Sequence, residues 1–330
     1  MPPIHRRAVG VLALAALAAA ALPVAADGGP GILLLAHGSH RPGGHGSHGS
    51  HGSHGGHGGP EAAGSPSAET GGAPVDTWNA NVDRLARRLD VHRPTEVAFG
   101  MADPQAIQAA VDRLAARGVT EIAVVPLFVS SHSPIIGNFR YILGLQDGLA
   151  ATTSLRSLDR IAPGDASFRF AGAMDDHPLV GAILRERALA ETADPAATSV
   201  VLIAHGPNTE EENRRWLAAM ETHAALLRAR GGFRRVSVLT HRNDAPPAVK
   251  DAARAAFRRE VAEAAQAGTV VVVPLLLSSG GIEREVEGDL RGLPYRFARP
   301  LMPHPNLERW VLDRVAALYP EAPALRRLTP

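Results

Sequence analysis

The chain carries the same strand-like pattern twice, and this internal repeat limits its fold more than any other feature. Three segments recur in the same order: LLLAHG at Leu33–Gly38 with VLIAHG at Val201–Gly206, VVPLFVSS at Val124–Ser131 with VVPLLLSS at Val272–Ser279, and a His-Pro pair at 177–178 with one at 304–305. Repeated units of this length indicate a duplicated structural domain. The sequence therefore predicts two similar domains.

Each domain is expected to be of the α/β class. The run GILLLA at Gly31–Ala36 is continuously apolar, which is typical of a parallel strand buried on both faces. Strand and helix patterns then alternate, with a helix predicted over 75–89, a strand over 96–101, a helix over 105–117 and a strand over 121–129. This alternation predicts two similar α/β domains, each a parallel sheet with helices on both faces.

The matched segments lie 168, 148 and 127 residues apart, so the first half contains two insertions. One is a His/Gly/Ser-rich stretch after His37, and the other is expected around Thr152–Gly164. We predict an N-terminal domain over 27–165, with a flexible insert at about 40–73, and a C-terminal domain over 166–330. The His-Pro pairs are each expected to open a helix.

Residues 1–26 resemble a secretory signal peptide. His5, Arg6 and Arg7 precede an apolar run from Ala8 to Ala26 that ends in small residues. The sequence therefore predicts an exported protein, periplasmic or extracellular, with no membrane contact after cleavage. The apolar run is also long enough for an uncleaved membrane anchor, which remains the alternative.

Composition excludes several classes of function. The chain has no cysteine, which excludes disulfides, thiolate zinc sites and cysteine-ligated iron–sulfur clusters. Lys and Arg number 34 against 33 Asp and Glu, so there is no basic excess for nucleic acid. No GxxxxGK[ST] motif is present, so no nucleotide cofactor is expected. The oligomeric state stays open.

Two histidines follow strands of the first half. His37 comes directly after the first predicted strand, and His132 follows VVPLFVSS. Because ligands of parallel sheets bind beyond the carboxyl ends of the strands, neighbouring strands would bring both imidazoles to one crevice. There they could hold a divalent metal or act as a general base. In the second half His205 is retained, but Gly280 stands at the place of His132, and Glu283 follows as a substitute ligand or the start of a helix.

A histidine-rich tract follows the first of these strands. Its imidazoles are separated by Gly and Ser, which disfavour a stable helix or strand, and they belong to His40, His45, His48, His51, His54 and His57. Such tracts bind Co²⁺, Ni²⁺, Zn²⁺ or Cu²⁺. The tract is either an auxiliary metal-binding segment beside His37 or a low-complexity expansion with incidental affinity.

The strand ending in AHGS and the VVPLF strand followed by histidine resemble the sirohydrochlorin cobalto- and ferrochelatases, ATP-independent class II tetrapyrrole chelatases. The resemblance also covers Asp103-Pro104 and the His-Pro pair before the last helix, and it extends through both halves like the long, two-domain members. It implies insertion of Co²⁺ or Fe²⁺, with Ni²⁺ not distinguished, into sirohydrochlorin, in cobalamin or sirohaem biosynthesis. His37 and His132 would bind the incoming metal and help take up the pyrrole protons.

The chain departs from the family pattern where acidic residues are usual. Gly100-Met101 stands where the family has a glutamate, with Asp103 the acidic residue nearby, and Asn138 is the polar candidate where an aspartate is usual. We expect Ser39, Ser130, Ser131 and Arg140 to bind carboxylates of the macrocycle. Two alternatives stay open: an exported metal- or tetrapyrrole-binding protein without turnover, and a two-domain solute-binding protein.

Overall fold

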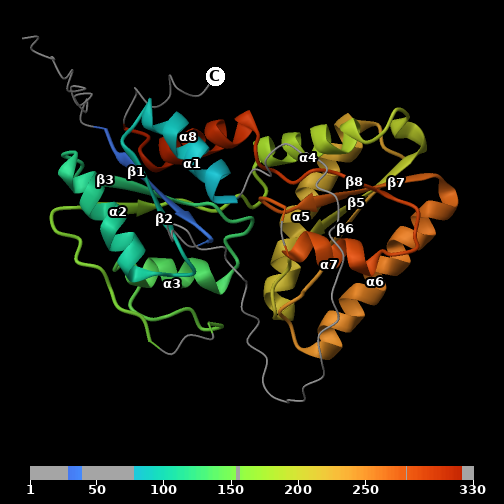
Figure 1. Ribbon diagram of the computed structural model, residues 1–330, viewed down its shortest axis with the longest axis horizontal. Helices are drawn as coiled ribbons and strands as arrows, with labels where there is room; N and C mark the ends of the chain where they lie inside the picture. Colours follow the sequence, from blue (N-terminus) through green and yellow to red (C-terminus); the bar gives the residue numbers. More distant parts are fainter. Residues whose placement is uncertain (1–28, 39–77, 154–156, 280, 322–330) are drawn as a thin grey trace, which may run out of the picture.

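The computed structural model describes residues 29–38, 78–153, 157–279 and 281–321, which form two α/β domains side by side (Figure 1). Each domain contains a four-stranded parallel sheet, and the two sheets have the equivalent strand orders β2-β1-β3-β4 and β6-β5-β7-β8. The predicted fold class is therefore confirmed. The predicted signal peptide, Ser39 and the histidine tract lie outside the described residues.

The first domain follows the order expected from the sequence. Its strands are β1 (Gly31–Ala36), β2 (Thr95–Phe99), β3 (Glu121–Pro126) and β4 (Ser167–Phe170), and its connecting helices are α1 (Trp78–Asp90), α2 (Pro104–Ala116) and α3 (Pro134–Ile142). All six residues of β1 are buried, as a strand covered on both faces requires.

The second domain repeats this arrangement. Its strands are β5 (Thr198–Ala204), β6 (Arg235–Thr240), β7 (Thr269–Leu275) and β8 (Arg296–Phe297), and its connecting helices are α5 (Glu210–Gly231), α6 (Pro247–Ala267) and α7 (Gly281–Asp289). A short 3₁₀ turn, Pro195–Ala197, precedes β5. Within the described ranges, no helix is long and apolar enough to cross a membrane.

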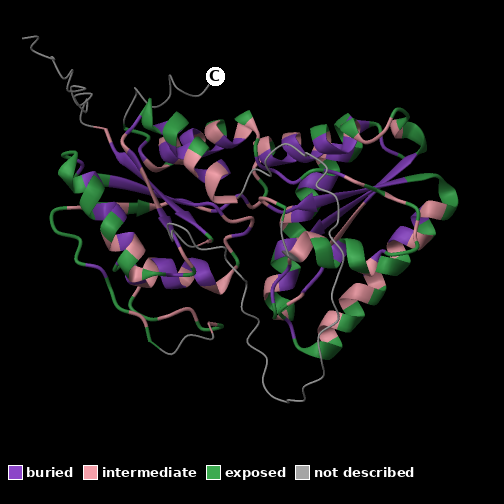
Figure 2. Cartoon of the chain, in the orientation of Figure 1, coloured by how far each residue is buried: buried purple, intermediate pink, exposed green. Residues whose placement is uncertain are grey.

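Side-chain alternation divides the core into layers. Leu33 and Leu35 pack against α2 and α3 on the outer face of the first sheet. Ile32 and Leu34 face the opposite way, into one apolar cluster that continues through α1, α8 (Pro305–Leu318), α4 (Pro178–Ala190) and α5 to the second sheet. The helices accordingly bury one side and expose the other (Figure 2). The two domains therefore share one core.

Helices α4 and α8 are exchanged between the domains. Helix α4 follows the last strand of the first sheet but contacts β7 and α5, whereas α8 follows the second sheet and contacts β3 and α1. Both begin at the predicted His-Pro pairs, where Nδ1 of His177 and of His304 accepts a hydrogen bond from the backbone N–H two residues on. The two helices also contact each other.

The domain boundary differs from the one expected between residues 165 and 166. Strand β4 lies beyond that position, yet it pairs with β3 in the register Val124↔Phe170. The first sheet therefore includes residues assigned to the second domain, because the insertion before β4 obscures the strand in the sequence.

Candidate functional site

His37 and His132 lie at the same edge of the first sheet. Strands β1 and β3 are neighbours, with Leu35 opposite Pro126, so the loops that follow them emerge side by side. Both histidines are exposed. This is the strand arrangement on which the prediction of a shared crevice depended.

The glycine of each Ala-His-Gly motif has a steric reason. Gly38 has φ +128°, and a Cβ there would lie 2.8 Å from Asn79 Oδ1. Its repeat counterpart Gly206 has φ +76°, and a Cβ would lie 2.5 Å from Thr240 Cβ. Only glycine adopts these conformations without strain, so the chain turns sharply after each histidine.

The backbone that carries His132 is held at several points. The His132 N–H donates to Ser130 Oγ at 3.1 Å, and the His132 carbonyl accepts from Trp216 Nε1 at 3.2 Å. The preceding Ser131 donates to Asp175 through its backbone N–H at 2.7 Å and through its hydroxyl at 2.6 Å. The backbone at His132 is therefore fixed on both sides, while the imidazole itself is exposed.

The described residues that were expected to bind macrocycle carboxylates all have partners inside the protein. The hydroxyls of Ser130 and Ser131 are already paired inside the protein, and Ser130 is buried, so both act in positioning His132. Arg140 is half-buried, and its guanidinium lies 4.6 Å from the ring centroid of Phe170. Ser39 lies outside the described residues.

The structure also accounts for the acidic positions. Asp103 caps α2 by accepting from the N–H groups of Gln105 and Ala106 at 3.0 and 3.1 Å. Asn138 is buried and donates to Thr153 Oγ1 at 2.8 Å. Met101, with 56% of its surface exposed, takes the place beside the end of β2.

Sequence reasoning missed two carboxylates at the same edge. Asp175 and Asp176 follow β4. The Asp175 carboxylate accepts two hydrogen bonds from Ser131, the residue before His132. Asp175 has φ +44°, in the left-handed region, which few non-glycine residues other than Asp and Asn adopt. The signal available in the sequence was the Asp-Asp pair directly before the His177-Pro178 marker.

The equivalent edge of the second domain differs in chemistry. His205 Nδ1 donates to the Gly206 carbonyl at 2.7 Å, and its Nε2 lies 3.2 Å from Asp244 Oδ2. Burial lowers the pKa of His205, but the bonds to Asp244 and to the carbonyl outweigh it and leave this pKa raised. An imidazole whose two nitrogens are both engaged inside the protein is a poor metal ligand. Glu283 lies in the first turn of α7, and Gly280 lies outside the described residues.

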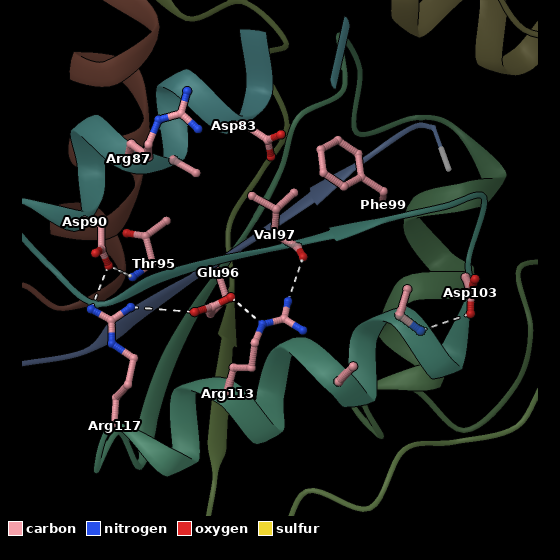
Figure 3. Close-up of a pocket in the computed structure, with 13 residues that line it drawn as sticks. Asp83, Arg87, Asp90, Thr95, Glu96, Val97, Phe99, Asp103, Arg113 and Arg117 are labelled. Atoms are coloured by element: carbon pink, nitrogen blue, oxygen red, sulfur yellow. Dashed lines mark hydrogen bonds and ion pairs between the residues drawn. The ribbon is translucent and has the colours of Figure 1, made fainter. Parts of the chain in front are cut away.

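Among the described residues, those at the end of β1 and β3 included, no group of three or more His, Asp or Glu side chains is arranged to hold a metal ion. A hollow of about 640 Å³ runs along the free edge of β2 between α1 and α2 (Figure 3). Four carboxylates line the hollow, and two of them are paired with arginines, Glu96 with Arg113 at 2.6 Å and Asp90 with Arg117 at 2.7 Å. Asp103, a third, caps α2.

Comparison with known families gives two matches in this chain. The CbiX family model matches residues 71–191 and residues 199–318, one copy in each half. A search of curated proteins finds no match.

Solved structures with the same fold include three of interest. The chain is similar to SirB from Bacillus subtilis with Fe³⁺, with 17% identity, a TM-score of 0.57, and 89% of this chain and 97% of that chain covered. The sirohydrochlorin chelatase SirB from Bacillus subtilis subspecies spizizenii in complex with cobalt gives 16% identity, a TM-score of 0.55, and coverage of 89% and 97%.

The third is DR2241 from Deinococcus radiodurans, a multi-domain protein with structural similarity to chelatases, at 20% identity and a TM-score of 0.51. The match covers 87% of this chain but 54% of the Deinococcus protein, so the chain spans about half the length of that relative. At these identities the likeness concerns the fold.

Proposed function

Since the chain belongs to the CbiX family, we propose that its first domain inserts a divalent metal ion, Co²⁺ or Fe²⁺, into a sirohydrochlorin-type tetrapyrrole. The observation that carries the proposal is the pair of exposed imidazoles, His37 and His132, in the loops that follow the neighbouring strands β1 and β3. The metal and the tetrapyrrole are both substrates in this reaction. Imidazole accepts Co²⁺, Fe²⁺ and Ni²⁺, so the choice of metal is left to experiment.

The two imidazoles supply what metal insertion requires. A divalent ion replaces two pyrrole protons, so the site must present the ion to the ring nitrogens and accept protons near neutral pH. Neutral imidazole serves both purposes, since it is a metal ligand and a base with an ordinary pKa of about 6.5. Arg140, half-buried on α3, is the group proposed to pair with carboxylates at the rim of the ring.

The direct test is anaerobic mixing of the protein with sirohydrochlorin and Co²⁺, followed by the absorbance change of metallation. We expect a rate above the buffer rate, abolished by His132→Ala and by His37→Ala without loss of the fold. The matched control is His205→Ala, which removes the equivalent histidine of the second repeat and should leave the rate per folded molecule within about twofold. Unchanged rates in His132→Ala would remove the site assignment.

An exported binding protein without turnover is the second candidate. It is favoured by one observation, that the acidic residue nearest the end of β2, Asp103, is occupied as a helix cap. Such a protein would bind Co²⁺ and the tetrapyrrole at His37 and His132 but give no metallation above buffer. Equilibrium binding measured beside the rate separates the two candidates.

We also propose that the protein is exported through residues 1–26 and that the histidine tract concentrates metal near His37. The tract holds six imidazoles between His40 and His57 and follows His37 in the chain, so metal bound there stays close to the site. Deletion of residues 40–60 should slow metallation when Co²⁺ is limiting and leave it unchanged at saturation. An equal rate at limiting Co²⁺ would assign the tract no part in the reaction.

A further inference from the structure

We propose that helix α5 of the second domain is a positioning element for the first-domain site, with Trp216 as the residue that fixes His132. This inference rests on the proposed function for its catalytic consequence. It concerns a helix from the domain whose own histidine, His205, is paired with Asp244. The second domain would thus contribute to metal insertion by holding the first-domain site in place.

Three side chains of α5 reach three different segments of the first domain. Trp216 Nε1 donates to the His132 carbonyl at 3.2 Å, and His223 Nε2 donates to the Asp175 carbonyl at 2.8 Å. Near the start of the helix, Glu212 accepts from Thr152 Oγ1 at 2.7 Å. Trp216 and His223 lie four and eleven residues after Glu212. In a helix with 3.6 residues per turn, this spacing places the three side chains within about 40° of one another around the axis. One face of α5 therefore lies against the site edge.

The hydrogen bond from Trp216 to the His132 carbonyl starts from a buried and tightly packed indole ring. Trp216 is 7% exposed and belongs to the core shared by the two domains. A buried indole N–H needs an acceptor, and this one uses the carbonyl of His132. The ring is held by packing from the second domain, so its N–H defines where the His132 carbonyl must lie. The imidazole on the same residue is positioned as a consequence.

His223 supports the neighbouring loop in the same way. It is buried, and burial lowers the pKa of its imidazole, so the ring is neutral when it donates to Asp175. The Asp175 carboxylate in turn accepts hydrogen bonds from the backbone N–H and the hydroxyl of Ser131, the residue before His132. Arg314 of α8 adds a bond from Nη2 to the Ala173 carbonyl at 2.6 Å. The loops after β3 and β4 are thus both tied to the second half of the chain.

The test compares two tryptophans of the same core. Trp216→Phe keeps an aromatic ring and removes the N–H donor. Trp310→Phe is the matched control, because Trp310 is fully buried in that core and its Nε1 has no hydrogen-bond partner among the described residues. Both substitutions disturb packing, but only the first removes a bond to the site.

We expect Trp216→Phe to lower kcat for metallation by about 3- to 10-fold, the equivalent of one net hydrogen bond, with KM for the tetrapyrrole unchanged. Hydrogen exchange at the backbone N–H groups of Ser131 and His132, measured without metal or substrate, should accelerate by a similar factor. Trp310→Phe should change neither quantity. Equal exchange in Trp216→Phe and wild type overturns the inference, and so does an equal effect of both variants. Absence of turnover in the wild type would refute the proposed function alone, since the exchange comparison needs no activity.

Discussion

At the scale of single residues, the Ala-His-Gly motifs at the ends of β1 and β5 have different neighbouring side chains. His37 is exposed and lies at the sheet edge where β2 is followed by Gly100 and Met101. His205 is half-buried, and its Nε2 lies 3.2 Å from Asp244 in the loop after β6. A carboxylate beside His205 therefore gives this imidazole a partner within the fold of the second domain. Both repeats contain the histidine, but the groups next to each imidazole determine which interactions it can make.

The His205–Asp244 pair should make stability depend on pH. The pKa of His205 is raised, so its stabilisation is complete below the ordinary value of about 6.5 and is lost as pH rises through the folded-state value. The pKa of Asp244 is lowered by its bond to His205, so the pair also weakens when pH falls below about 4. Asp244→Asn should therefore lower the free energy of unfolding by about 0.5–1 kcal/mol at pH 6 and by less at pH 9.

Urea denaturation of the wild type and Asp244→Asn at the two pH values measures this difference. Asp251→Asn, which removes an exposed carboxylate from α6, serves as the control for net charge. A loss of stability that is the same at pH 6 and pH 9 would contradict the ion-pair assignment.

Among the elements, the exchanged helices α4 and α8 begin in the same unusual way. An imidazole Nδ1 caps each of them, and the second ring nitrogen faces an acidic residue of the other helix: His177 lies 3.8 Å from Asp313, and His304 lies 3.0 Å from Glu186. The acid follows the capping histidine by nine residues in both helices. The contacts are thus reciprocal, as in a twofold-symmetric interface.

The His177 cap predicts a loss of stability in mild acid. Burial and the nearby Arg314 lower the pKa of His177 to about 4, so the folded state keeps the ring neutral while the unfolded chain takes up a proton near pH 6.5. Stability should fall as pH falls from 6.5 towards 4. His177→Asn keeps a capping acceptor and removes the titrating group. Denaturation curves at pH 7 and pH 5 should show a smaller decrease in the variant, and an equal decrease would contradict this role.

Prediction from sequence succeeded for elements whose signals are local. Gly31–Ala36 is continuously apolar and forms the buried β1, and the His-Pro pairs mark the starts of α4 and α8. Prediction from sequence failed for residues whose hydrogen-bond partners are distant along the chain. Ser131 looked like a loop donor, but its partner Asp175 is 44 residues away, and the His132 carbonyl meets Trp216 after 84 residues. No periodicity in the sequence reports such contacts.

In the whole molecule, the exchange of α4 and α8 makes each domain depend on the other. Arg187 of α4 donates to the carbonyls of Pro300 and Pro303 after β8, at 3.1 and 2.9 Å. Arg314 of α8 donates to Ala173 after β4, and it lies 127 residues beyond Arg187, the offset of the His-Pro pairs. A shared core and crossed arginines imply that the two domains unfold together.

Arg314→Met tests this coupling, because methionine keeps an apolar side chain of similar length and removes the bonds to the loop after β4. We expect the free energy of unfolding of both domains to fall together by about 1.5–3 kcal/mol, the range for hydrogen bonds to a charged group. Hydrogen exchange of peptides from β1 and from β5 across a urea series gives the two values separately. Arg309→Met, at an exposed arginine of the same helix, should leave both unchanged. A loss confined to the peptide from β1 would mean that the domains are independent and that the helix exchange does not couple them.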